Sequence, residues 1–511
     1  MKTKTTLVLL FILSLSLALA GSLGVAQAAP VAERLVVLTG ADASTFDPHF
    51  ATDSATELFN KNMYSNLTRF NAAMQIEPDL ALGWTTSADG LQWTFRLRPN
   101  VTFHDGTKLT ADDVKASFER ILNPETGSPR RSVLSSIQKV EVKDPLTVVL
   151  HTRYPTGALA QFLAHPAAAV ISSAALKAYG RDLAKKPVGT GPFKFKEWKL
   201  GEEIVLERFE RYYDGAPMVR NVHFRIVPED SVRALLLQSN QADVALLLPV
   251  TEVKRLSSEP NIKSLEVTSV MTYYYALNCT KPMLNDVRVR QALNYALDLD
   301  LIVNNILEGQ GEVADAPLSK LTWGYSPIKK YPYDPAKAKA LLAEAGYPNG
   351  IDLELWHTAG RYLMDVQINE NAQAQWAKAG IRIKIRQWEF QALMEAVKKG
   401  VHDMVYLGWS PSTGDADQAI YATLHGSQWV PQSNRALYKN AAVDTLLADA
   451  RVEVDPKVRF ELYRKAMTVI MDECPWVFMF WPKEVLMYRS NVDGLVFLPT
   501  QHLLLGKVTK K

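Results

Sequence analysis

The sequence predicts an α/β protein in which helices cover both faces of a parallel sheet. The prediction rests on three strand-like runs between residues 351 and 408, which are separated by two segments with helical periodicity that each end at a glycine. The strands are expected at Ile351–His357, Ile381–Ile385 and Asp403–Gly408, and the helices at Tyr362–Ala379 and Phe390–Lys399. Such an alternation is typical of a parallel sheet, because each helix returns the chain to the same edge.

Capping and turn residues predict elements elsewhere in the chain. Thr110, with Asp113 three positions later, predicts the start of a helix. Asp334-Pro335 and Asp455-Pro456 each place a capping residue before a proline at the first helical position, so two more helices are expected there. The further strands are expected at Val36–Thr39, in a hairpin over residues 93–103 with its turn at Pro99-Asn100, and in two strands over residues 139–152 around Asp144-Pro145.

The composition is typical of a globular protein and excludes several classes. The 511 residues include 57 Lys and Arg against 54 Asp and Glu, so the formal net charge is +3 and no basic run predicts nucleic-acid binding. At roughly 150 residues per domain, the length predicts about three structural units. Cys279 and Cys474 are too few for a disulfide-rich scaffold or a CxxC motif. We expect two buried thiols, with a single disulfide as the alternative.

The first 28 residues have the features of a secretory signal peptide. Lys2 and Lys4 precede an apolar core from Leu7 to Ala20, and Val25-Ala26-Gln27-Ala28 supplies a small-residue cleavage pattern. We therefore predict cleavage after this pattern and export of the protein. The alternative is an uncleaved membrane anchor, because the uncharged stretch that continues to Ala32 is long enough to span a bilayer.

The carboxyl ends of the three predicted strands locate a candidate binding site, because ligands of open parallel α/β sheets bind there. Arg361 follows the first strand, and Asp415 and Asp417 follow the third. Opposite charges facing one cleft suit a zwitterionic ligand, with the guanidinium binding a carboxylate and an acid binding an ammonium group. The alternatives are a solvated charge for Arg361 and helix capping for the two aspartates. Trp388 and Trp409 end the second and third strands, and they either contact ligand or belong to the core.

No motif predicts catalysis or a bound metal. The patterns HExxH, GxSxG and GxxxxGK[ST] are absent from the sequence. The nine histidines are scattered, with no two within four residues, so no preformed metal site is expected. We expect neither a cofactor nor enzyme activity. An exported hydrolase with a dispersed catalytic site is the alternative class, although no base–nucleophile pair supports it.

Ordered sequence blocks recur along nearly the whole chain after the leader. They are Thr45-Phe46-Asp47-Pro48-His49, Phe103–Gly106, Thr110–Val114, Pro187–Phe195 with Glu197-Trp198 and Gly201, Tyr212–Gly215 and Asp286–Leu293. Together these blocks resemble the bacterial extracellular solute-binding proteins of family 5, which are the dipeptide, oligopeptide and nickel receptors of ABC importers.

The resemblance implies a two-lobed periplasmic-binding-protein fold of type II, in its large three-unit form, with a hinge between the lobes. Lobe I would comprise residues 29–270 and 484–511, with an inserted subdomain at about 70–186. Lobe II would comprise residues 271–483.

The resemblance also implies roles for particular residues at a ligand site between the lobes. Arg361, followed by Tyr362, and Asp415 stand where dipeptide-binding members bind the two termini of the peptide. Ser412 stands near where those members often have an acid, so it is the alternative position for the ammonium contact. Phe46 would line the cleft from lobe I, with a structural turn before Pro48 as the alternative.

The implied function is a periplasmic receptor that binds short peptides and delivers them to the permease subunits of an ABC transporter at the membrane. The receptor is expected to be a monomer. Nickel chelates, oligosaccharides and opine-like solutes are alternative ligands, because the same fold carries them all.

Overall fold

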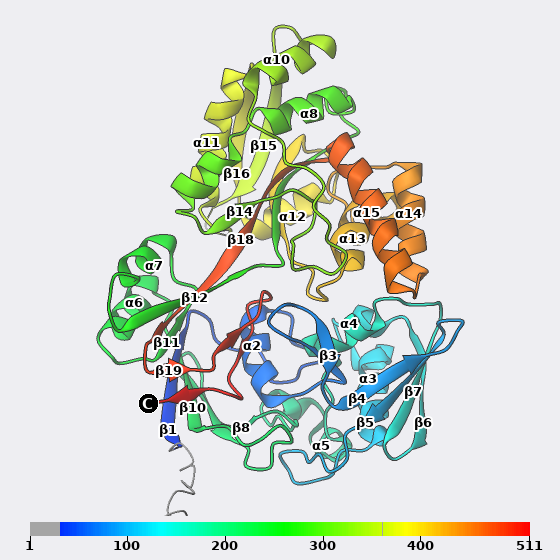
Figure 1. The fold of residues 1–511 in the computed structure, drawn as a ribbon, viewed down its shortest axis with the longest axis vertical. Coiled ribbons are helices and arrows are strands. Elements are labelled where there is room, and N and C mark those ends of the chain that lie inside the picture. Colours follow the sequence, from blue (N-terminus) through cyan, green and yellow to red (C-terminus); the bar gives the residue numbers. More distant parts are fainter. Residues whose placement is uncertain (1–30, 360) are drawn as a thin grey trace, which may run out of the picture.

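One long strand, β18 (Trp476–Arg489), connects two parts of the molecule (Figure 1). Its first half pairs antiparallel with β13 (Thr272–Leu277), and its second half pairs with β11 (Val244–Leu246) and β12 (Ile262–Thr268). We call β13 to α15 the upper part, and β1 to β12 with residues 490–511 the lower part, as they lie in Figure 1. This computed structural model describes residues 31–359 and 361–511, so the predicted leader lies outside the described residues.

A large sheet runs through both parts because β18 belongs to both. Its strand order is β16-β15-β17-β13-β18-β11-β1-β10-β9-β8, and β12 and β14 pair with β18 beside this path. The strands not yet given are β1 (Ala32–Thr39), β8 (Phe193–Lys199), β9 (Glu203–Arg208), β10 (Val219–Ile226), β14 (Gly311–Val313), β15 (Ile351–Thr358), β16 (Ile381–Trp388) and β17 (Met404–Trp409).

The upper part confirms the predicted parallel sheet with helices on both faces. β15 pairs in parallel with both β16 and β17. Side chains of β17 alternate between two hydrophobic clusters, with Met404 and Tyr406 in one and Val405 and Leu407 in the other. The first cluster includes α8 (Val287–Tyr295), α10 (Pro335–Glu344) and α11 (Asp365–Lys378), and the second includes α12 (Phe390–Val397), α14 (Ala441–Val452) and α15 (Pro456–Glu473).

The predicted helix starts are confirmed where a capping residue was identified. The side chain of Asp334 accepts from the Lys337 N–H at 2.8 Å at the start of α10. Asp455 does the same for Lys457 at the start of α15, again at 2.8 Å. In α3 (Ala111–Leu122), Thr110 forms the expected capping box with its third helical residue. These local contacts satisfy N–H groups that have no partner within the helix.

Helix α11 begins three residues later than the sequence predicts. The carboxylate of Asp365 accepts from the backbone N–H groups of Arg361 and Tyr362, both at 3.2 Å, and from the Thr358 hydroxyl at 3.3 Å. Because these N–H groups bond to a side chain, the segment after β15 stays a loop and presents Arg361 at its surface.

The lower part contains a separate antiparallel sheet, β4 (Ala81–Thr86), β5 (Gln92–Leu97), β7 (Thr147–Thr152) and β6 (Ile137–Asp144), in that spatial order. The predicted pair of strands over residues 139–152 is confirmed as β6 and β7. The predicted hairpin over residues 93–103 is wrong, because β5 pairs with β4 and β7 instead. Pro99 lacks an N–H for the ladder and Asn100 adopts φ +62°, so the chain turns away from the sheet after Leu97.

The remaining elements of the lower part are short. They are α2 (Ser54–Met63), α4 (Leu159–Ala164), α5 (Ser173–Tyr179), α6 (Asp230–Gln238), α7 (Val250–Leu256), and the strand pairs β2 (Thr68–Phe70) with β3 (Ile76–Pro78), β19 (Val492–Asp493) with β22 (Thr509–Lys510), and β20 (Val496–Phe497) with β21 (Leu503–Leu504).

Both cysteines are free thiols, as expected from the sequence. Burial raises the pKa of the Cys279 thiol to about 11 and that of Cys474 to about 12. The Cys474 thiol donates to the Tyr331 hydroxyl at 3.0 Å. Across residues 31–359 and 361–511, no helix is both long enough and apolar enough to span a bilayer.

Candidate functional site

Arg361 provides an exposed positive charge at the carboxyl end of β15. Its guanidinium carbon lies 5.2 Å from the centroid of the Tyr362 ring and 4.9 Å from that of the Phe390 ring, a cation–π arrangement on two sides. No ion pair involving Arg361 occurs in the described part of the chain. The side chain is therefore positioned by aromatic rings, and its five N–H donors are left for an external acceptor.

Tyr362 links this arginine to the aromatic core of the upper part. Its ring packs edge-on against Tyr273 of β13, with centroids 5.5 Å apart, and against Tyr406 of β17 at 5.9 Å. The Tyr273 hydroxyl accepts from the Leu363 N–H at 3.5 Å. The loop that carries Arg361 is thus packed directly on the strand that leads from the lower part into the upper part.

The two candidate tryptophans are half-buried rather than fully enclosed. Trp388, at the end of β16, packs on Trp356 with ring centroids 4.9 Å apart, and the guanidinium of Arg386 lies 4.2 Å from its ring centroid. Trp409, at the end of β17, donates from Nε1 to the Gln418 carbonyl at 2.9 Å. Both rings lie at the strand ends where the sequence places them, and each also contributes to the hydrophobic packing of that edge.

Asp415 occupies a different environment from the one expected of a ligand contact. Its side chain is 0% exposed, and both carboxylate oxygens bind Arg459 of α15, at 2.8 and 2.5 Å. Arg459 is itself almost fully buried and also contacts the ring of Trp323, 4.3 Å from its guanidinium. The carboxylate is therefore fully used by an internal, bidentate ion pair, which gives it a structural role in this conformation.

Asp417 lies two residues further along the same loop. It is nearly buried, and Nε of Arg451 lies 3.4 Å from its Oδ1. Burial raises the pKa of Asp417 to about 6, although Arg451 opposes this shift. The backbone N–H of Asp417 donates to Asp415 at 2.9 Å, so the two acids belong to one loop structure.

Phe46 does not line a cleft, contrary to the expectation from the sequence. Its side chain is 0% exposed, and its ring packs against Phe195 at 5.1 Å and Trp198 at 4.9 Å in the core of the lower part. The neighbouring Asp47 is buried too, and it forms a bidentate ion pair with Arg120 at 2.5 and 3.0 Å. A large apolar residue beside a turn carries no sequence signal that separates cleft lining from core.

A groove of about 540 Å³ separates the upper and lower parts on one side. Residues 73–76 and Gln161 line it from the lower part, and residues 320–323 line it from the upper part. The N–H of Trp323 donates to the Gly414 carbonyl at 2.8 Å, so the groove adjoins the loop that follows β17.

Two glycines allow the parts to touch beside this groove. A Cβ placed on Gly414 would lie 2.7 Å from Met74 Cε across the interface. A Cβ on Gly157 would lie 2.1 Å from the backbone oxygen of Glu453. The Glu453 oxygen belongs to the backbone, so position 157 requires glycine in this arrangement of the two parts. Met74 Cε is the end of a flexible side chain, and at Gly414 it is the backbone conformation, φ +58°, that favours glycine.

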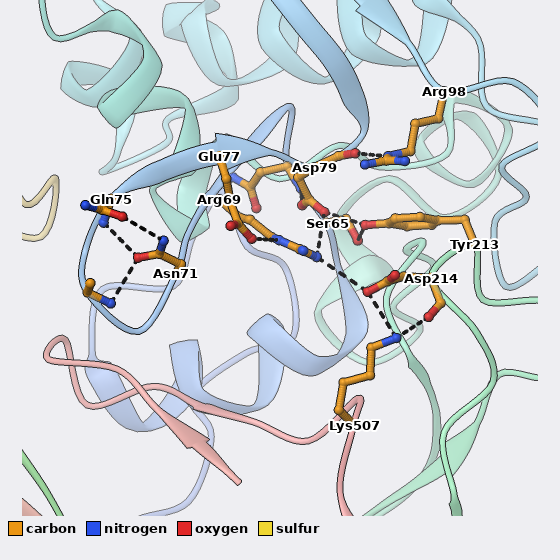
Figure 2. Close-up of polar contacts among 12 residues, drawn as sticks. Ser65, Arg69, Asn71, Gln75, Glu77, Asp79, Arg98, Tyr213, Asp214 and Lys507 are labelled. Carbon is orange, nitrogen blue, oxygen red and sulfur yellow. Dashed lines mark hydrogen bonds and ion pairs between the residues drawn. The ribbon is translucent and has the colours of Figure 1, made fainter. Parts of the chain in front are cut away.

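A second cavity, of about 290 Å³, lies entirely within the lower part (Figure 2). Figure 2 shows Arg69 among three acids: Glu77 at 2.7 Å, Asp79 at 3.7 Å and Asp214 at 3.8 Å, with Lys507 bound to Asp214 at 3.3 Å. These ion pairs connect the β2–β3 hairpin to the C-terminal segment. We therefore assign this cluster a structural role.

Sequence reasoning missed three residues that shape the candidate site. Phe390 was taken only as the first residue of a helix, yet its ring supports Arg361. Arg459 is the partner of Asp415, from a helix 44 residues away in sequence. Glu484 on β18 is a buried acid. Only Glu484 carried a signal, because an acid within a mostly apolar strand is unusual.

Comparison with known proteins identifies the family. The family model described as "Bacterial extracellular solute-binding proteins, family 5 Middle" matches residues 75–430. The chain belongs to this family. A glutathione-binding protein, GsiB of Salmonella paratyphi A, is 34% identical over 494 residues, which cover 95% of this chain and 96% of the relative.

Solved structures of family members share the fold of this chain. HbpA2 from Haemophilus parasuis superimposes with a TM-score of 0.87 at 28% identity, over 94% of this chain and 100% of that one. The periplasmic binding protein DppA from Helicobacter pylori, in complex with the peptide STSA, gives 0.78 at 31% identity, over 94% and 98%. The mixed α/β fold is therefore that of family 5 periplasmic binding proteins, as the sequence blocks predict.

Proposed function

We propose that this protein is the extracytoplasmic receptor of an ABC importer and binds a short peptide between two lobes. Family membership and similarity to proteins named for glutathione and peptide binding support this proposal. We propose residues 29–270 with 484–511, including an insertion at about 70–186, as lobe I, and residues 271–483 as lobe II. Working as a monomer in the periplasm, it would pass its ligand to membrane permease subunits.

The observation that carries the proposal is the state of Arg361. An exposed guanidinium, held over two aromatic rings and without an ion pair in the described chain, is prepared to bind a carboxylate in bidentate geometry. It lies where ligands of parallel α/β sheets bind, beyond the carboxyl ends of β15, β16 and β17. Trp388 and Trp409 at the same edge offer flat apolar surface.

Glutathione and short linear peptides are the first ligands to test. Glutathione is a tripeptide with one ammonium group and two carboxylates, so it carries the group that Arg361 would recognise. Calorimetry of the purified protein with glutathione, di- to pentapeptides, nickel with free histidine, and oligosaccharides would separate these ligand classes. Binding of peptides or glutathione alone supports the proposal, and binding of sugars or nickel chelates alone contradicts it.

Arg361→Ala tests the carboxylate contact directly. Loss of one partner of a hydrogen-bonded charge pair costs about 2 kcal/mol at the low end of measured values, which corresponds to about 30-fold weaker binding. Arg386→Ala is the matched control, because Arg386 is another arginine stacked on tryptophan rings, on the adjacent strand β16. If amidating the peptide carboxylate weakens binding to the parent protein but not to Arg361→Ala, the contact is established. If Arg361→Ala and Arg386→Ala bind every peptide with equal affinity, the proposed contact is refuted.

A further inference from the structure

Glu484 is a buried acid on the strand that connects the two parts. Its side chain is 7% exposed, and no Lys, Arg or His nitrogen of the described chain lies within ion-pair distance of its carboxylate. The neighbouring Lys483 pairs instead with Glu266 of β12, at 3.6 Å. Lys483 and Glu484 have different partners because successive side chains of a strand point to opposite faces of the sheet. Glu484 shares a face with Leu486, whereas Lys483 shares the opposite face with Val485.

Two neutral side chains, those of Gln501 and Ser269, act on the Glu484 carboxylate. Burial raises the pKa of Glu484, and these two side chains oppose that shift without cancelling it. Gln501 holds the left-handed backbone conformation, φ +66°, which is uncommon for a residue other than glycine. A buried carboxylate without a cation beside it lowers the stability of the fold, so its presence calls for a function.

Tyr273 relates Glu484 to Arg361. The pKa of the Tyr273 hydroxyl is raised mainly by burial; the Glu484 carboxylate raises it further, and the Arg361 guanidinium lowers it. Both charges therefore act on the same phenol, and the N–H of Leu363 donates to that phenol oxygen at 3.5 Å. The contacts agree: Arg361 lies over the Tyr362 ring, which packs on Tyr273, and Tyr273 pairs with Phe480, four residues before Glu484 on β18.

Neither acid of the loop after β17 is free to supply the negative charge that a zwitterion needs. Asp415 is fully used by Arg459, and Asp417 is nearly buried, with Nε of Arg451 3.4 Å from its Oδ1. Ser412, which replaces the acid expected from the resemblance, carries no charge and hydrogen-bonds to the Gln418 side chain at 3.2 to 3.3 Å.

We propose that Glu484 binds the ammonium group of the ligand whose carboxylate binds Arg361. The inference rests on the proposed function, and it narrows the ligand to molecules that carry both a free amino group and a free carboxylate. The acid would then come from the connecting strand rather than from the loop of the upper part. An incoming ammonium would give the Glu484 carboxylate a cation, which no described residue of the chain supplies.

Glu484→Gln tests this assignment with two independent measurements. The first is calorimetric affinity for trialanine and glutathione, each with a free and with an acetylated amino group. We expect Glu484→Gln to weaken binding of the free-amine ligands by about 10- to 100-fold. The affinity for the acetylated ligands, which the parent already binds more weakly, should not change. Glu266→Gln, which alters an acid on the opposite face of the same strands, should bind like the parent.

The second measurement is thermal unfolding without ligand at pH 7.5. Because Gln removes an uncompensated buried charge, Glu484→Gln should unfold at a higher temperature than the parent. Lower stability, failure to fold, or equal loss of free and acetylated ligands would each show a structural acid and overturn the assignment. If Arg361→Ala abolishes peptide binding while Glu484→Gln keeps its preference for free amines, only this inference fails. If no peptide binds the parent protein, the proposed function fails, and the unfolding measurement still tests whether Glu484 is uncompensated.

Discussion

The ion pair between Asp415 and Arg459 offers the most direct test of how the upper part is stabilised. Both side chains are at most 2% exposed, and two hydrogen bonds join them. Removing one partner leaves the other charged, buried and unpaired, which typically lowers the free energy of unfolding by 3–5 kcal/mol. For a unit the size of the upper part, such a loss lowers the unfolding temperature by about 10 °C. We expect this loss in Asp415→Ala and in Arg459→Met.

The double variant Asp415→Leu with Arg459→Met separates charge pairing from packing. It replaces both charges by apolar groups of similar size, so it should recover most of the stability lost in either single variant. Urea unfolding of the parent, the single variants Asp415→Leu and Arg459→Met, and the double variant at pH 7.5, followed by tryptophan fluorescence, measures the coupling. Single variants that lose less than about 1 kcal/mol would refute the reasoning. A stable Asp415→Ala protein that no longer binds ligand would instead restore the ligand-contact role expected from the sequence.

Three further predictions concern the buried Asp417, the contact between the two parts at Gly157, and the ring of Phe390 beside Arg361. Burial raises the pKa of Asp417 from its ordinary value to about 6, so ionisation of this carboxyl lowers the stability of the folded protein as pH rises. Asp417→Asn should therefore be more stable than the parent by about 3 kcal/mol at pH 7.5 but not at pH 4, as urea unfolding would show. Gly157→Ala would place a Cβ against the Glu453 carbonyl and should hold the two parts apart, seen as a larger radius of gyration in solution scattering and weaker ligand binding. Phe390→Ala removes one ring from beside Arg361 and should weaken carboxylate ligands several-fold, whereas Phe390→Tyr should not.

The sequence predicts the fold where local rules decide the structure. The alternation of strands and helices between residues 351 and 408 required only periodicity and glycines at helix ends, and capping residues located α3, α10 and α15. The prediction of a hairpin over residues 93–103 failed because β5 pairs with β4 on one side and, on the other, with β7, which is more than 50 residues away. Strand pairing over such distances depends on tertiary packing, which no local pattern encodes.

The candidate site was predicted as a position but not as a set of partners. Arg361 lies at the end of β15, as expected from strand topology. Asp415 was expected to be available because the sequence offers no sign that Arg459, on a later helix, occupies it. Phe46 shows the same limit, because only the packed structure reveals that Phe195 and Trp198 enclose it. Residue type therefore indicated which chemistry was present, whereas the fold decided which groups remain free to use it.

The position of the proposed charges has a consequence for how a ligand would be selected. Arg361 follows β15, which is joined to β18 through β17 and β13 in one continuous sheet, and Glu484 is part of β18 itself. Glu484 begins the lobe I segment of β18 at the crossing between the proposed lobes, and Arg361 belongs to lobe II, so the distance between the two charges depends on how the lobes are arranged. A peptide would be selected by whether the spacing of its terminal charges matches that distance. Closure of the lower part, through the glycine contacts at Gly157 and Gly414, would then enclose ligands that already fit. On this reasoning, Gly157→Ala should weaken all ligands by a similar factor, whereas Glu484→Gln should change the preference among them.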